Sequence, residues 1–272
     1  MFSHQTHKNL SMLKDGKLTD RTYWEGTYNS RKRQPPLSID GFKNYSNRLI
    51  LDRLLEVGME NKRILEVGAG DSAWLPYLAK RFPSSQFVGV DYSESGCTLL
   101  SERARRMGVN VEVVQEDMFA EHSPLHGTFD TAISFGVVEH FDDLGHVLSA
   151  KRRYLKHDGI LFTIIPNMSG VLGALTRIWN RKVYDKHNPH DWFSFLLGHQ
   201  QAGLDLVSGG YLCSTNFGVL SSCFPERRGL SWQMSRVLVA ATLAIWSVEN
   251  MIGNLPTSKT FSPYIYAISR CV

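Results

Sequence analysis

Four cysteines in 272 residues are too few and too scattered for the two structural roles that cysteine commonly has. None of them belongs to a CxxC pair, and no Cys/His cluster has the spacing of a zinc site, so we expect no metal. A chain of this length buries enough core to do without disulfides. Reduced thiols and a cytoplasmic location are therefore the simplest expectation.

The sequence also lacks a leader and a long apolar run. Met1 to Lys17 is polar and has no apolar segment of the kind that a signal peptide needs. The longest apolar stretch, Val237 to Val248, is shorter than the about 20 residues that cross a bilayer, so no transmembrane segment is expected. Because this stretch lacks a polar face rich in Lys and Arg, we expect it to be buried inside the protein or in a homodimer.

Strong charge of one sign is missing as well. The formal net charge is +4, and the basic clusters are short. Arg103–Arg106 and Lys151–Arg153 fall in helical patterns and are expected to face solvent. No basic face with interleaved aromatic residues is visible, so nucleic acid is not an expected partner.

What the sequence does contain is an alternation of short apolar runs with helical patterns. Strands are predicted at 63–67, 86–90, 111–114, 129–135 and 159–165, with helices at 73–81, 95–107 and about 144–155. This alternation predicts a doubly wound α/β fold, a parallel sheet with helices on both faces. Two more strands are predicted at 204–213 and 263–269, and a cap helix at 42–57.

These patterns divide the chain into two parts. Residues 1–58 form an N-terminal arm and cap helix, and residues 59–272 form the α/β domain. Helical insertions are expected at about 168–203 and 224–258, after the fifth and sixth strands.

A glycine turn follows the first strand in Glu66-Val67-Gly68-Ala69-Gly70. Glycines at this point allow a tight turn and the close approach of a ligand. The pattern Gly68-x-Gly70-x-x-Ala73 also satisfies the dinucleotide fingerprint, with Asp91 at a suitable distance. An NAD-dependent oxidoreductase or epimerase is therefore an alternative, as is a non-catalytic nucleoside-binding module.

Charge favours a different ligand. A pyrophosphate prefers bare backbone N–H groups, and the carboxylates of Glu66 and Asp71 beside the turn would repel it. A ligand with a sulfonium and an ammonium against one carboxylate suits such neighbours. We expect Asp71 to cap the following helix.

Further carboxylates follow the next two strands. Asp91 is placed to accept hydrogen bonds from ribose hydroxyls. Asp117 is placed to accept from an adenine amino group, with Met118 as an apolar wall. Phe135 and Gly136 end the fourth strand at the same crevice.

Together, these motifs resemble in order and spacing those of class I S-adenosylmethionine-dependent methyltransferases, over residues 60–167. The motifs are Glu66-x-Gly68-x-Gly70, the Asp91 strand end, Glu116-Asp117 and Val138-Glu139-His140. The resemblance implies a mostly parallel seven-stranded sheet whose last strand inserts antiparallel beside the sixth. It also implies S-adenosyl-L-methionine as cofactor and S-adenosyl-L-homocysteine as product.

The resemblance further implies which residues meet the cofactor. It places Glu66, Gly68 and Gly70 near the methionine part, Asp91 on the ribose, and Asp117 with Met118 at the adenine. The N-terminal aromatic segment resembles one that closes over the cofactor in related enzymes. The remaining expected cofactor contacts are Tyr23, Trp24, Tyr28, Tyr92, Phe135 and Gly136.

The acceptor is less defined by the sequence. We expect a small molecule, methylated on an oxygen, of the natural-product or saccharide type. An oxygen of high pKa needs a base, and histidine suits that role near neutral pH. The candidates, in order, are His187, His140 and His190.

Overall fold

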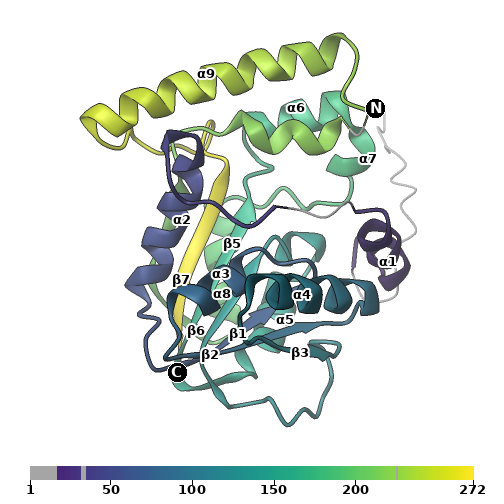
Figure 1. The fold of residues 1–272 in the computed structure, drawn as a ribbon, viewed down its shortest axis with the longest axis vertical. Helices are drawn as coiled ribbons and strands as arrows, with labels where there is room; N and C mark the ends of the chain where they lie inside the picture. Colours follow the sequence, from purple (N-terminus) through teal and green to yellow (C-terminus); the bar gives the residue numbers. More distant parts are fainter. Residues whose placement is uncertain (1–16, 32–34, 225) are drawn as a thin grey trace, which may run out of the picture.

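The computed structural model describes residues 17–31, 35–224 and 226–272. Its centre is a seven-stranded sheet in the order β3-β2-β1-β4-β5-β7-β6 (Figure 1). The strands are β1 Arg63–Val67, β2 Gln86–Asp91, β3 Glu112–Gln115, β4 Phe129–Phe135, β5 Leu155–Pro166, β6 Leu204–Leu212 and β7 Tyr264–Cys271. The first five run parallel, and β7 pairs antiparallel with both β5 and β6. The prediction of a mostly parallel sheet with an inserted antiparallel last strand is confirmed.

Helices cover both faces of this sheet (Figure 1). They are α1 Arg21–Asn29, α2 Tyr45–Glu56, α3 Trp74–Arg81, α4 Glu94–Met107, α5 Leu144–Arg152, α6 Val171–Trp179, α7 Arg181–Tyr184, α8 Trp192–Gln201 and α9 Leu230–Ile252. Three short 3₁₀ segments are η1 Phe42–Asn44, η2 Val138–His140 and η3 Phe217–Cys223. Successive strand residues enter opposite cores, because side chains alternate across a sheet. Ile64 packs in the cluster with α2 and α3, whereas Leu65 packs in the cluster with α5 and α8.

The strand order places a crevice at one edge of the sheet. The chain runs from β1 outward to β2 and β3, and then returns to β4 on the other side of β1. Ligands of open α/β sheets bind where the order reverses, outside the carboxyl ends of the strands. The loops that follow β1, β2 and β4 meet at this point.

The N-terminal segment is more ordered than the sequence indicates. Of the predicted arm, residues 1–16 and 32–34 lie outside the described residues. Residues 21–29 form α1, where the Asp20 side chain accepts a hydrogen bond from the Tyr23 N–H at 2.7 Å. A helix of nine residues is too short to be stable by itself in water, so α1 depends on contacts with the domain.

The expectation that the two basic clusters face solvent is wrong for one member of each. Arg103 and Lys151, members of the basic clusters expected to face solvent, are 3% and 0% exposed. The helix around the apolar stretch 237–248 is not buried inside the protein. It extends over 23 residues and contains an 18-residue stretch with a mean hydropathy of 1.2, of which 22% is buried. Among the described residues it is the one helix whose length and composition would allow it to cross a membrane.

Candidate functional site

The turn after β1 requires glycine for steric reasons. Gly68 and Gly70 have φ of +76° and +34°. A Cβ on Gly68 would lie 2.5 Å from Val137 Cγ2, and a Cβ on Gly70 would lie 2.0 Å from Tyr28 Oη. The close approach at Gly70 is therefore made by a side chain of α1. Gly68 itself lines the cleft.

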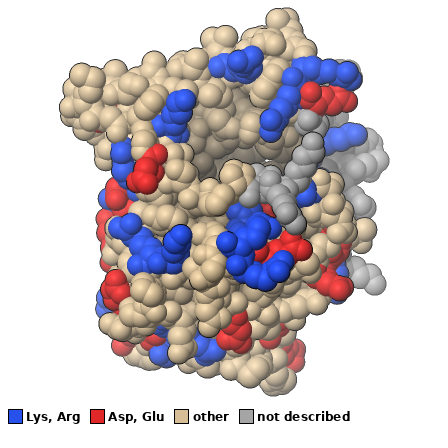
Figure 2. Space-filling view, viewed as in Figure 1, with Lys and Arg blue, Asp and Glu red and all other residues tan. Residues whose placement is uncertain are grey.

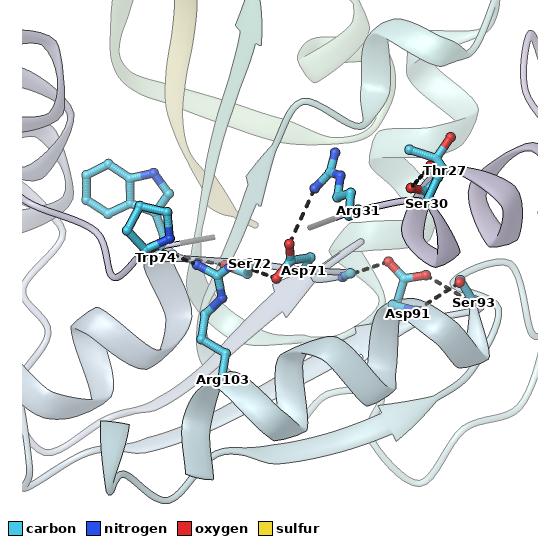
Figure 3. Close-up of polar contacts among 12 residues, drawn as sticks. Thr27, Ser30, Arg31, Asp71, Ser72, Trp74, Asp91, Ser93 and Arg103 are labelled. Atoms are coloured by element: carbon cyan, nitrogen blue, oxygen red, sulfur yellow. Dashed lines mark hydrogen bonds and ion pairs between the residues drawn. The ribbon is translucent and has the colours of Figure 1, made fainter. Parts of the chain in front are cut away.

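Asp91 ends β2 at the floor of the cleft. Its carboxylate accepts hydrogen bonds from the Gly70 N–H and the Ser93 N–H, both at 2.8 Å (Figure 3). Burial raises the pKa of Asp91 to about 6 despite these two donors. A carboxylate has about four acceptor sites, so two remain for the hydroxyls of a ligand. This arrangement matches the expected ribose contact.

Helix α1 is fastened beside this floor by two contacts. Glu25 accepts hydrogen bonds from the Glu94 N–H at 2.7 Å and the Ser95 N–H at 3.1 Å, at the start of α4. The Tyr28 ring lies against two glycines, Gly70 and Gly96. A Cβ on Gly96 would lie 2.9 Å from the ring. These contacts therefore hold α1 in one position against the domain.

The aromatic residues of α1 form one wall of the cleft. Trp24 stacks on Tyr28 with ring centroids 5.6 Å apart, and both line the cleft. Tyr23 packs edge-on against Trp24 at 5.2 Å, but it is not a lining residue. Its ring instead faces the Lys186 ammonium at 3.8 Å.

The opposite wall comes from the segment after β3 and from Tyr92. Asp117 accepts a hydrogen bond from the Phe119 N–H at 3.0 Å, which fixes the short turn. Met118 and Phe119 add apolar surface, as expected for a nucleobase site. The cleft encloses about 640 Å³ including its mouth, within the range of small-ligand sites.

The cleft is acidic. The charged side chains that line it in the described part of the chain are Asp91, Glu116, Asp117 and Lys17. The single ammonium, Lys17, lies over the Phe119 ring at 4.6 Å. Three carboxylates against one ammonium favour a cationic ligand over a pyrophosphate.

The carboxylates that line the cleft do not include Glu66 or Asp71. Asp71 does not cap α3, whose N-cap is Ala73. It pairs with Arg103 at 2.5 Å and Arg31 at 3.7 Å, because these guanidinium groups approach from two sides (Figure 3). The Ser72 hydroxyl instead accepts from the backbone at the start of α3.

Glu66 lies beneath the turn. It is buried and accepts a hydrogen bond from Ser72 Oγ at 2.7 Å. It shares the interior with Glu139 and Lys151. Burial raises the pKa of both glutamates to about 8 and lowers that of Lys151 to about 7. Sequence periodicity did not reveal this group, because a Lys in a helical pattern is usually solvated.

Four predicted cofactor residues are not among the residues that line the cleft in the described structure. They are Tyr23, Glu66, Gly70 and Phe135. Phe135 stacks on Trp74, with ring centroids 5.3 Å apart, while the next residue, Gly136, does line the cleft. Glu66 supports the glycine turn and Gly70 packs against Tyr28 of α1, so neither residue lines the cavity itself.

His140 forms the inner end of the cleft. It is buried, packs edge-on against Trp24 at 5.3 Å, and lies 4.8 Å from the ring of His187. Its Nδ1 is 2.6 Å from the Lys186 carbonyl oxygen. Burial, with the neighbouring His187, lowers the pKa of His140 to about 3. The ring is therefore neutral.

His187 stands behind His140 and lines a second cavity of about 390 Å³. Apolar side chains dominate the lining, among them Met168, Leu172 and Val183. His187 Nδ1 is 2.8 Å from the Val183 carbonyl oxygen, and burial lowers its pKa. His140, which lines the first cavity, and His187, which lines the second, are thus neighbours.

His190 is set apart from this pair. Burial lowers its pKa, and its Nε2 is buried without a hydrogen-bond partner in the described structure. It lines neither cavity among the described residues. The structure thus brings together two of the three histidines that the sequence indicated.

Glu139, His140 and His187 also place ligand-type atoms within 4.8 Å of one another. Ligand atoms around a tetrahedral zinc ion lie about 3.4 Å apart. The observed spacing is wider, so the side chains would have to move to hold such an ion.

Comparison with known proteins shows that the chain is similar to methyltransferases. Residues 64–159 match the family model described as "Methyltransferase domain". A malonyl-[acyl-carrier protein] O-methyltransferase of Geobacter sulfurreducens is 34% identical over 113 residues, 41% of this chain and 41% of that protein. A ubiquinone biosynthesis O-methyltransferase of Neisseria meningitidis is 27% identical over 158 residues, 54% of this chain and 65% of that protein. The chain therefore spans less than two thirds of the length of these relatives.

Solved structures share the fold over nearly the whole chain. Geranyl diphosphate C-methyltransferase from Streptomyces coelicolor A3(2) superimposes with a TM-score of 0.55 at 17% identity, covering 93% of this chain and 96% of that one. Residues 64–159 thus match a methyltransferase domain, and the sheet order and the acidic cleft agree with the resemblance to class I S-adenosylmethionine-dependent methyltransferases. The cofactor of this class is S-adenosyl-L-methionine.

Proposed function

We propose that this chain transfers a methyl group from S-adenosyl-L-methionine to an oxygen atom of a small-molecule acceptor. The observation that carries the proposal is the acidic cleft at the carboxyl ends of β1, β2 and β4, within a matched methyltransferase domain. When bound, the cofactor supplies a methyl carbon on a positively charged sulfur. The same carboxylates disfavour the pyrophosphate of NAD, the alternative ligand.

Different residues of the cleft bind different parts of the cofactor. Asp91 accepts from the ribose hydroxyls, and Asp117 accepts from the adenine amino group beside Met118. The rings of Trp24 and Tyr28 close the cleft and attract positive charge. Glu66 holds the glycine turn through Ser72 and is a positioning residue.

His187 is the proposed base. A backbone carbonyl only accepts, so His187 Nδ1 carries the proton and Nε2 keeps its lone pair. Burial keeps the ring neutral, the form that can take a proton from an acceptor hydroxyl. His140 has the same tautomer, but its pKa of about 3 makes it a weaker base, and it positions the His187 ring.

The acceptor occupies the second cavity in this proposal. Its largely apolar lining favours a natural-product type of molecule over a saccharide. Both curated relatives named above are O-methyltransferases, which supports an oxygen nucleophile. The protein aligns this oxygen with the methyl carbon and excludes water from the contact.

Calorimetry tests the cofactor half of the proposal. We expect S-adenosyl-L-methionine and S-adenosyl-L-homocysteine to bind to the purified chain and NAD to leave no heat signal. Binding of NAD alone would overturn the assignment. A screen with labelled methyl donor and a panel of hydroxylated and carboxylated small molecules then identifies the acceptor.

Histidine variants test the acceptor half. We expect His187→Ala to lower turnover by about 10²–10⁴-fold, the contribution typical of a general base, with cofactor affinity unchanged. His190→Ala is the matched control, because this histidine lies outside both cavities and should retain turnover. Equal turnover in the two variants would remove His187 from the role of base.

A further inference from the structure

Helix α9 buries several polar side chains. The residues buried along it are Ser235, Thr242, Trp246 and Glu249. Their spacing of seven, four and three places them on one side of a helix. Leu238 and Leu243 also pack against the hydrophobic clusters of the domain. The side of α9 that faces the domain is therefore mixed, polar as well as apolar.

The opposite side of α9 is apolar and exposed. Val237 and Met251 are 68% and 85% exposed. Together, the large apolar residues exposed on this helix are Leu230, Met234, Val237, Val248, Met251 and Ile252. Between them lie the small residues Ala240, Ala241 and Ala244, also exposed. A continuous apolar face of this size marks an interaction site.

Inward hydrogen bonds hold α9 flat on the domain. Thr242 Oγ1 accepts from the Phe217 N–H at 3.1 Å, and Trp246 Nε1 donates to the Thr215 carbonyl at 2.9 Å. Glu249 accepts from Ser214 Oγ at 2.9 Å and from the Leu255 N–H at 3.0 Å. A helix fastened in this way lies along a surface, and spanning a bilayer would break these bonds.

Basic residues lie on α9, on the turn before it and on α6 and α7. They stand at separate points of a largely uncharged layer (Figure 2). The exposed cations without an ion pair in the described part of this layer are Arg177, Lys182, Arg227 and Arg236. The nearby carboxylates Asp185 and Glu226 are already paired, with Arg181 and Arg228.

We propose that α9 docks on the surface of an anionic lipid bilayer. Its apolar side chains would enter the boundary between headgroups and acyl chains, and the surrounding cations would meet lipid phosphates. A second copy of this face is a poorer partner, because two-fold symmetry opposes the same cations without adding free carboxylates. The cations come mainly from α6, α7 and the turn before α9, which explains why the pattern of the helix alone did not indicate them.

This inference does not depend on methyl transfer, and vesicle flotation with the full chain tests it. We expect binding to phosphatidylcholine vesicles that contain phosphatidylglycerol and little binding to phosphatidylcholine alone. Val237→Glu should lower the partition coefficient by at least about tenfold, since a charge in the apolar face opposes insertion. Arg236→Gln should lower it about fivefold, the equivalent of ~1 kcal/mol per basic residue near an anionic surface.

Val207→Glu is the matched control, because Val207 is 54% exposed on β6 and belongs to another surface. It should bind vesicles as the unmodified chain does. Sedimentation equilibrium supplies the opposing outcome. A dimer that Val237→Glu dissociates, in a chain that ignores anionic vesicles, would overturn the proposal in favour of self-association.

Discussion

Replacing Gly70 with alanine should displace α1 from its position against the domain. The new Cβ would lie 2.0 Å from Tyr28 Oη, whereas ordinary contact begins at 3.4 Å, so the hydroxyl must move by about 3.4 − 2.0 = 1.4 Å. The Tyr28 ring cannot yield toward Gly96, because the backbone there already lies against it. The movement must therefore pass to the helix that carries Trp24.

The energetic cost has two parts, and Gly108 separates them. Gly108 also has a positive φ, +65°, but a Cβ there would meet nothing within 4 Å. Gly108→Ala should therefore lower the free energy of unfolding by about 1–2 kcal/mol, the cost of the left-handed backbone alone. Gly70→Ala should cost this amount plus about 1–3 kcal/mol for overpacking against Tyr28.

Urea denaturation and calorimetric titration with S-adenosyl-L-methionine measure the two effects. We expect Gly70→Ala to weaken cofactor binding by roughly ten- to hundredfold, because a displacement of about 1 Å spoils an aligned site. In the double variant with Tyr28→Ala the overpacking cost should vanish, giving a coupling of about 1–3 kcal/mol. Equal stability of Gly70→Ala and Gly108→Ala, with unchanged cofactor affinity, would refute the reasoning.

Three further outcomes follow from the cleft. Cofactor affinity should fall about tenfold per pH unit below about pH 6, because protonation of Asp91 turns one acceptor oxygen into a donor and removes the negative charge. Asp91→Asn should bind weakly at every pH in the same titration, and a flat profile in the unmodified chain would contradict the ribose role. Asp71→Ala should lower the free energy of unfolding by about 3 kcal/mol in urea, since Arg103 is left charged and buried. A loss below about 1 kcal/mol would mean that the Asp71–Arg103 ion pair contributes little to stability. Trp24→Ala should weaken cofactor binding about tenfold by calorimetry, within the range of a desolvated cation–π contact, whereas unchanged affinity would leave the ring a packing role only.

The fold could be predicted from the sequence because periodicity and glycine act locally. The strand at 129–135 begins and ends where the apolar run does, and the turn at Gly68 requires a positive φ that a side chain would oppose. The strand ends then place Asp91 and Asp117 without any knowledge of packing. This reasoning holds for residues whose role depends on their own neighbours in the chain.

The rest of the site depends on contacts between distant residues. Asp71 looks like a helix cap until Arg103, 32 residues later, approaches it. Lys151 looks solvated in the sequence, but the fold buries it where it interacts electrostatically with Glu66 and Glu139. The inward polar contacts of α9 are hidden for the same reason, because Thr242 and Glu249 find their partners in η3 and in the segment that follows β6.

The position of β7 has a consequence for how the molecule is completed. β7 lies between β5 and β6, so β6 has no sheet partner in the described structure except the last eight-residue strand of the chain. During synthesis, β6 therefore has no strand to pair with until Tyr264–Cys271 has left the ribosome. Until β7 arrives, the edge of β5 remains open and exposed while the strands that precede it in the chain are already paired.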